Sequence, residues 1–130
     1  MLSLHPSQRY FFYNGVTDMR KGFDGLCGVV RDQFQRDPLS GDVFIFLSRS
    51  GSRIKFLHWQ GDGFALYYKR LEKGTFEFGR TTSCSSVAIS AQELMLIMEG
   101  ISLASVKKRV RYSHQNVGNY SMQKRIEMQP

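Results

Sequence analysis

The sequence predicts an α+β fold, with an antiparallel meander sheet of four to five strands, two helices and a basic C-terminal tail. Three strand-like segments follow one another in the middle of the chain, and helical spacing of apolar residues occurs on either side of them. The repeated alternation of strand and helix that a parallel sheet requires is missing. With 130 residues, 42% of them hydrophobic, the chain has the size of one domain. We expect that domain over residues 1–104 and a basic, flexible tail over residues 105–130.

The amino-terminal part of the chain predicts one strand and one helix. Residues 8–13 (QRYFFY) form an aromatic run with high strand preference, which ends at the turn-forming pair Asn14 and Gly15. Thr17 and Asp18 then supply side-chain oxygens that can cap the start of a helix. Apolar residues recur after this cap at helical spacing, at Met19, Phe23, Leu26, Cys27, Val30 and Phe34.

Three glycines interrupt this predicted helix at regular spacing. Gly22, Gly25 and Gly28 each weaken a helix by about 1 kcal/mol relative to alanine, so a compensating interaction is needed. Residues three apart lie along one side of a helix, where glycines would form a smooth ridge that allows close approach. We therefore expect this ridge to pack on the sheet.

The middle of the chain predicts the meander. Three strand segments follow one another, at residues 43–47 (VFIFL), 54–59 (IKFLHW) and 64–70 (FALYYKR). Glycine-containing turns at residues 48–52 and 61–63 separate them, which favours antiparallel hairpins. The first segment is apolar throughout, so we expect it at the sheet centre or covered on both faces. Residues 75–78 (TFEF) alternate in polarity over a short span and predict an edge strand.

The second predicted helix follows a polar loop at residues 80–86. Residues 87–89 (VAI) lead into the helix, and Ser90 with Glu93 three residues later forms a capping-box pattern. The remaining signals are an apolar face and a terminating glycine, formed by Leu94, Ile97, Met98 and Gly100.

An excess of positive charge indicates an anionic partner. Eighteen lysines and arginines oppose eleven acidic residues, which gives a formal net charge of +7. Most of the excess lies after residue 100, chiefly at Lys107, Lys108, Arg109 and Arg111. From residue 113 onward the chain is polar and aperiodic, as in segments that cannot offset their own ordering entropy. The tail is either a solubilising extension or an interaction arm, and as an arm it would bring these four cations to nucleic acid.

The sequence contains no arrangement that indicates catalysis. The three histidines stand in unrelated contexts, without the spacing of a metal site. Asp18 and Asp62 are explained by a helix start and a turn, and Asp24 would lie on another side of the helix from Asp18. Cys27 and Cys84 are far apart, and we expect two buried, reduced thiols. We expect no catalytic residue, no metal site and no cofactor.

The chain also shows no signal for a membrane or for export. No window approaches the roughly 18 uninterrupted apolar residues of a membrane helix, and residues 1–10 lack the apolar stretch of a signal peptide. We expect a cytoplasmic protein that does not bind membranes.

A basic and aromatic segment at residues 59–73 (WQGDGFALYYKRLEK) is typical of surfaces that bind single-stranded nucleic acid. Strand alternation would assign half of its aromatic side chains to the core. We therefore expect exposed, nucleic-acid-binding side chains at Tyr67, Lys69 and Arg70.

Arg20 and Lys21 are two further candidates. In the first turn of the predicted helix they would oppose the positive end of the helix dipole, which is unfavourable unless a negative group compensates. A nucleic-acid phosphate is one such group, and the carboxylates of Asp18 or Asp24 are the other.

Three ordered segments resemble a known protein family. They are residues 17–26 (TDMRKGFDGL), 37–46 (DPLSGDVFIF) and 54–76 (IKFLHWQGDGFALYYKRLEKGTF). Together they are similar to the second-open-reading-frame, TnpB-type protein of the insertion sequence 66 family of bacterial transposons. The stretch at residues 56–58 departs from relatives that tend to be richer in Trp, and the chain after Gly100 does not align.

The resemblance implies a small accessory protein of transposition, in an element whose separate, larger transposase carries the acidic catalytic residues. It implies that transposase and the other accessory protein of the element as partners, together with DNA, and leaves a homo-oligomer open. Two functions follow. The chain either assembles transposase with element DNA, through the meander and residues 107–111, or is a protein-only adaptor that binds the transposase without DNA contact.

Overall fold

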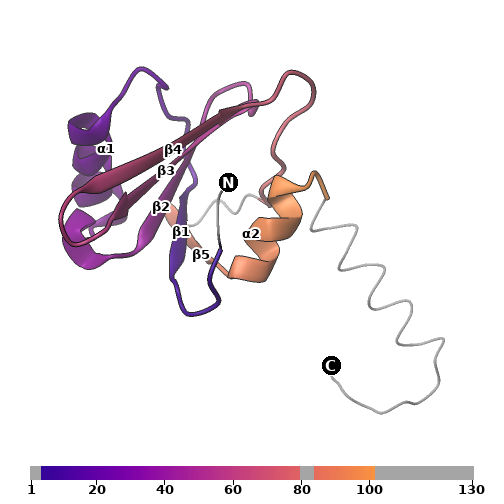
Figure 1. Ribbon diagram of the computed structural model, residues 1–130. Coiled ribbons are helices and arrows are strands. Elements are labelled where there is room, and N and C mark those ends of the chain that lie inside the picture. Colours follow the sequence, from indigo (N-terminus) through magenta and orange to yellow (C-terminus); the bar gives the residue numbers. More distant parts are fainter. Residues whose placement is uncertain (1–3, 80–83, 102–130) are drawn as a thin grey trace, which may run out of the picture.

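The computed structural model describes residues 4–79 and 84–101 and shows one sheet with helices on both faces (Figure 1). The strands are β1 (Tyr10–Tyr13), β2 (Val43–Leu47), β3 (Arg53–Trp59), β4 (Phe64–Arg70) and β5 (Ser86–Ile89). The helical elements are α1 (Phe23–Val29), the π-helical η1 (Val30–Phe34), the 3₁₀ turn η2 (Pro38–Ser40) and α2 (Ala91–Met98). The predicted α+β fold with two helices is confirmed.

The five strands form one sheet in the order β4-β3-β2-β1-β5. Strands β2, β3 and β4 form the predicted antiparallel meander, and β5 also runs antiparallel to β1. Strand β1 instead pairs in parallel with β2, with Phe11 opposite Phe44. The reason is the connection through α1, which crosses one face of the sheet and returns the chain in the same direction. The sheet is therefore mostly, not wholly, antiparallel.

One face of the sheet is covered by α1 and η1. Leu26 and Val30 are fully buried there and pack in one cluster with Phe44, Phe46 and Leu57 from the central strands. Every residue of β2 is buried, as its apolar sequence predicted, because this strand has helices on both faces and a strand on either side.

The start of α1 differs from the prediction. The helix begins at Phe23, with Gly22 at the N-cap and no side-chain cap, so Thr17 and Asp18 do not cap it. The predicted glycine ridge is also wrong: a Cβ added at Gly28 would meet nothing within 4 Å. The large side chains of Leu26 and Val30 occupy the sheet-facing side instead, because they bury more apolar area than glycines can.

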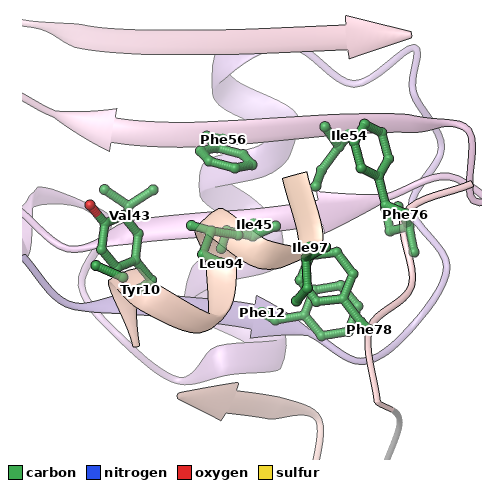
Figure 2. Close-up of a cluster of buried hydrophobic side chains, with 12 residues drawn as sticks. Tyr10, Phe12, Val43, Ile45, Ile54, Phe56, Phe76, Phe78, Leu94 and Ile97 are labelled. Carbon is green, nitrogen blue, oxygen red and sulfur yellow. The ribbon is translucent and has the colours of Figure 1, made fainter. Parts of the chain in front are cut away.

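The other face of the sheet is covered by α2 and by the segment before β5. Figure 2 shows Leu94 and Ile97 of α2 lying over β1 and β2, close to Phe12 and Ile45. Phe78 stacks on Phe12, with ring centroids 4.0 Å apart and planes 3° from parallel. This second cluster makes the sheet the middle layer of three.

The predicted edge strand at residues 75–78 is wrong. Phe76 and Phe78 are buried as their alternation indicated, but the segment pairs with no strand in the described ranges; the Phe76 N–H donates to the Gly51 carbonyl. The fifth strand is Ser86–Ile89, where residues 87–89 were expected only to lead into a helix. Alternating polarity predicts which side chains are buried, but it does not predict which backbone groups form hydrogen bonds between strands.

Helix α2 follows the prediction closely. The Ser90 hydroxyl accepts from the Glu93 N–H at 3.1 Å, while the Glu93 carboxylate accepts from the Ser90 N–H, so the capping box is complete. Gly100 after the helix adopts a φ of +84°, which favours glycine.

Cys27 is buried as expected, and its burial raises the pKa of its thiol, whereas Cys84 is exposed, so the expectation of two buried thiols is wrong. The domain end at residue 104 and the tail candidates Lys107, Lys108, Arg109 and Arg111 lie outside the described residues. Among the helices of the described segments, none is long and apolar enough to span a membrane.

Candidate nucleic-acid interface

The pleat of β4 divides the predicted nucleic-acid residues between the two faces of the sheet. Arg70 lies on the α1 face, because it pairs across the ladder with Arg53, two residues along β3 from Lys55. Lys69 pairs with Ile54 and Tyr67 pairs with Phe56, which places both on the α2 face. Tyr67 and Lys69 therefore do not share a surface with Arg70.

Tyr67 is also less exposed than predicted. It is half-buried, with its ring centroid 5.3 Å from that of Phe56. It lines a cavity of about 350 Å³ at the end of the α2 face, together with Tyr10 and His58. The exposed aromatic of this strand is Tyr68, 48% accessible on the α1 face. The period-two alternation of β4 is as predicted, but at Tyr67 and Tyr68 the more exposed aromatic side chain lies on the α1 face, opposite to the prediction.

Five cations are carried by segments that meet at one end of the α1 face, and we call them the basic face. They come from the loop before α1, from the β2–β3 hairpin and from the last residue of β4: Arg20, Lys21, Arg49, Arg53 and Arg70. All five are exposed. Arg49 and Arg53 line a common depression with Thr17 and Met19, which joins the hairpin to the loop before α1.

A buried lysine holds these segments together. Lys55 is only 5% exposed, and its ammonium donates to the carbonyl oxygens of Met19 and Lys21, each at 2.8 Å. The same ammonium lies 4.6 Å from the centroid of the Tyr68 ring, within the range of a cation–π contact. Lys55 thus ties the loop that carries Arg20 and Lys21 to the sheet that carries Arg53 and Arg70.

Arg20 has a partner of its own. Its side chain donates to the Asp18 carboxylate, with a shortest distance of 2.7 Å, and its backbone N–H donates to the same group at 2.9 Å. These hydrogen bonds lower the pKa of Asp18 from 3.8 to about 2, and those from the Arg20 side chain have the larger effect. Arg20 and Lys21 precede α1, so their predicted place in its first turn is wrong, and of the two compensating groups considered, the Asp18 carboxylate pairs with Arg20.

The other cations of the basic face are less compensated. Arg70 pairs with Glu72 at 2.9 Å, an exposed contact worth little in water. No described carboxylate lies within 4.0 Å of the charged groups of Lys21, Arg49 or Arg53. Arg53 and Arg70 face each other directly across the antiparallel ladder, and like charges in that position repel. An anion bound between them would remove this repulsion.

Sequence reasoning missed four residues of this surface: Arg49, Arg53, Lys55 and Tyr68. Their spacing contained a usable signal, because Arg53 and Lys55 alternate with apolar residues in β3 and so point away from Ile54 and Phe56. Which cations of β4 would join them depended on the hairpin register. Within the described ranges, no group of three His, Cys, Asp or Glu side chains could hold a metal ion.

The fold and this surface define a class: a small α+β protein that presents an exposed basic face beside a central sheet. The family is given by comparison with known proteins. Residues 8–108 match the family described as IS66 Orf2 like protein, and the chain belongs to this family, which indicates an accessory role in transposition.

Two similar proteins come from Sinorhizobium fredii (strain NBRC 101917 / NGR234). The one named "Uncharacterized protein y4hO" is 36% identical over 101 residues, which are 78% of this chain and 87% of the relative. The one named "Uncharacterized protein y4jC" is 32% identical over 93 residues, 72% of this chain and 79% of the relative. No solved structure matches the chain.

Proposed function

We propose that this protein is a non-catalytic accessory factor of transposition that helps to assemble the transposase with element DNA, and that DNA contacts its basic face. The observation that carries the proposal is the cross-strand pair Arg53 and Arg70, two exposed arginines opposite each other in the β3–β4 ladder and on the same face of the sheet. The two positive charges repel each other when the protein is free, and neighbouring phosphates of a DNA strand would neutralise them. Family membership supplies the transposition context.

The proposed contact is with the DNA backbone rather than with the bases. Guanidinium and ammonium groups on a strand end and two loops can follow a phosphate row, whereas base reading in the major groove needs an inserted helix or ribbon. Tyr68 is the exposed aromatic beside these cations and could stack on an unpaired base. The protein would thus fix DNA in place while the transposase supplies sequence recognition and chemistry.

Binding of the full chain to duplex DNA from the element ends, measured by fluorescence anisotropy at several salt concentrations, tests the proposal. If four cations neutralise phosphates, the log–log slope of affinity against salt should be about −3.6. Arg53→Gln should weaken binding and reduce that slope by about 0.9. Lys69→Gln removes the same charge from the α2 face and is the matched control. Equal losses in both variants would contradict the assignment of DNA to the basic face.

The main alternative is a protein-only adaptor that binds the transposase without DNA contact. Under that function the chain would co-purify with the transposase, and its anisotropy signal with DNA would be absent even at low salt. A chain lacking residues 105–130 separates the basic face from the tail. If this truncation abolished DNA binding while Arg53→Gln left it unchanged, the tail would be the contact and the basic face would not.

A further inference from the structure

The β2–β3 hairpin and the loop before α1 enclose an open depression of about 530 Å³ on the α1 face. Besides Met19, it is lined only by hydroxyl-bearing and cationic residues of the described chain: Thr17, Ser48, Arg49, Ser50, Ser52 and Arg53. This lining contains no carboxylate. A site built almost entirely from hydrogen-bond donors and positive charge attracts an anion.

The hairpin contributes a row of three hydroxyl groups. The oxygens of Ser48 and Ser50 are 3.3 Å apart, and those of Ser50 and Ser52 are 2.9 Å apart. The row has three hydroxyl hydrogens but only two contacts between its members, so at least one hydrogen is left to donate elsewhere. The Ser48 hydroxyl oxygen accepts from the Arg53 backbone N–H at 3.1 Å, so its own hydrogen points elsewhere. The row therefore has one hydroxyl hydrogen that can donate to a ligand.

Thr17 is the second, independent observation. It is 3% exposed, and its hydroxyl oxygen is buried without a hydrogen-bond partner in the described structure. Buried hydroxyl groups are nearly always paired, so an unpaired one beside a depression indicates a missing acceptor. Thr17 lines the depression, and rotation about its Cα–Cβ bond to another staggered position would move the hydroxyl out of its present buried position.

The wall of the depression is held in place by the fold. Gly51, at the hairpin tip, has a φ of +81°, and its carbonyl accepts from the Phe76 N–H at 2.8 Å. The Ser52 carbonyl accepts from the Leu71 N–H, also at 2.8 Å, and the Thr17 N–H donates to the Leu47 carbonyl at 3.0 Å. These bonds fix the loop backbone from outside, so the hydroxyl row is preorganised.

We propose that this depression is a phosphate-binding subsite, in which Arg49 and Arg53 supply charge and the hydroxyls of Thr17 and the serine row supply hydrogen bonds. A tetrahedral phosphate offers acceptors in several directions, which suits donors that come from two arginines and two separate loops. That this phosphate belongs to the DNA backbone rests on the proposed function. Free phosphate shares the same chemistry, and the experiment distinguishes the two sources.

The first arm titrates the full chain with inorganic phosphate and follows backbone amide signals by NMR. We expect saturable shifts concentrated at residues 17 and 48–53. Arg53→Gln should weaken phosphate binding about tenfold, as for loss of one charge-assisted hydrogen bond. Thr17→Val, which keeps the side-chain shape, should weaken it about threefold without loss of thermal stability. Lys69→Gln and Ser7→Ala should leave it unchanged, since both are exposed outside the depression.

The second arm measures duplex DNA binding of the same variants. The subsite is supported if phosphate shifts the amide signals of residues 17 and 48–53 and if Thr17→Val weakens this binding, whether or not DNA binds. If phosphate binds in this way but DNA does not bind, only the proposed function fails. Shifts spread over all exposed cations, or insensitivity to Thr17→Val, would overturn the subsite even if DNA binds. A Thr17→Val variant that loses stability would show a structural hydroxyl and also overturn it.

Discussion

Replacing Lys55 by methionine tests whether one buried ammonium organises the basic face. Methionine has a similar length and keeps the apolar contacts of the stem, but it cannot donate to the Met19 and Lys21 carbonyl oxygens. Each of these 2.8 Å bonds involves a charged donor, and such bonds contribute about 1.5–3 kcal/mol. Methionine also avoids the cost of burying a charge, which offsets part of the lost hydrogen-bond energy. We therefore expect the unfolding free energy to fall by about 2–4 kcal/mol.

Urea unfolding of the full chain measures this change, and Lys69→Met provides the matched control. Lys69 is exposed, so the same substitution there should change the unfolding free energy by less than about 0.5 kcal/mol. The Lys55 variant should also weaken DNA binding, because the loop that carries Arg20 and Lys21 is released from the sheet. A Lys55→Met protein as stable as the wild type, with unchanged amide shifts at residues 14–22, would refute the anchoring role.

Three further predictions concern individual groups. The Asp18 carboxyl should titrate near pH 2, so its contribution to stability is complete above its unfolded pKa of 3.8 and lost as pH falls through about 2. A wild-type NMR titration midpoint near 3.8 would contradict this, whereas Arg20→Gln, which keeps the backbone N–H bond, should raise the midpoint only part of the way toward 3.8. Iodoacetamide should modify exposed Cys84 in the native protein and leave buried Cys27 unmodified, which mass spectrometry of the peptides checks. Ser90→Ala removes the capping box and should lower the unfolding free energy by about 1 kcal/mol, measured by urea unfolding.

Local chemistry determined much of the fold directly from sequence. The run at residues 43–47 is apolar at every position and short, which favours a strand at the sheet centre or covered on both faces, as found. The bounds of β4 and the turns before and after β3 followed from glycine positions and period-two alternation. The capping box at Ser90 was equally readable, because its two hydrogen bonds lie within four residues.

Other features depended on contacts between distant segments. Residues 75–78 and 86–89 are both short and mixed in polarity, and only the free edge of β1 decided which of them became a strand. The predicted helix began at Met19, but the Lys55 ammonium binds the carbonyl groups of Met19 and Lys21, and the Asp18 carboxylate accepts from the Arg20 N–H, so the helix begins only at Phe23. Tertiary hydrogen bonds outweighed local propensity at this point.

By itself, the sequence determined the fold class, the central strand, the positive charge and the family resemblance, because these rest on composition, local period and ordered motifs. Only the tertiary structure decided which cations share a surface. Arg53 and Arg70 are 17 positions apart in the chain and meet through the β3–β4 register, while adjacent Lys69 points to the opposite face. The physical reason is the pleat of a strand, which separates neighbours in sequence and brings cross-strand partners together.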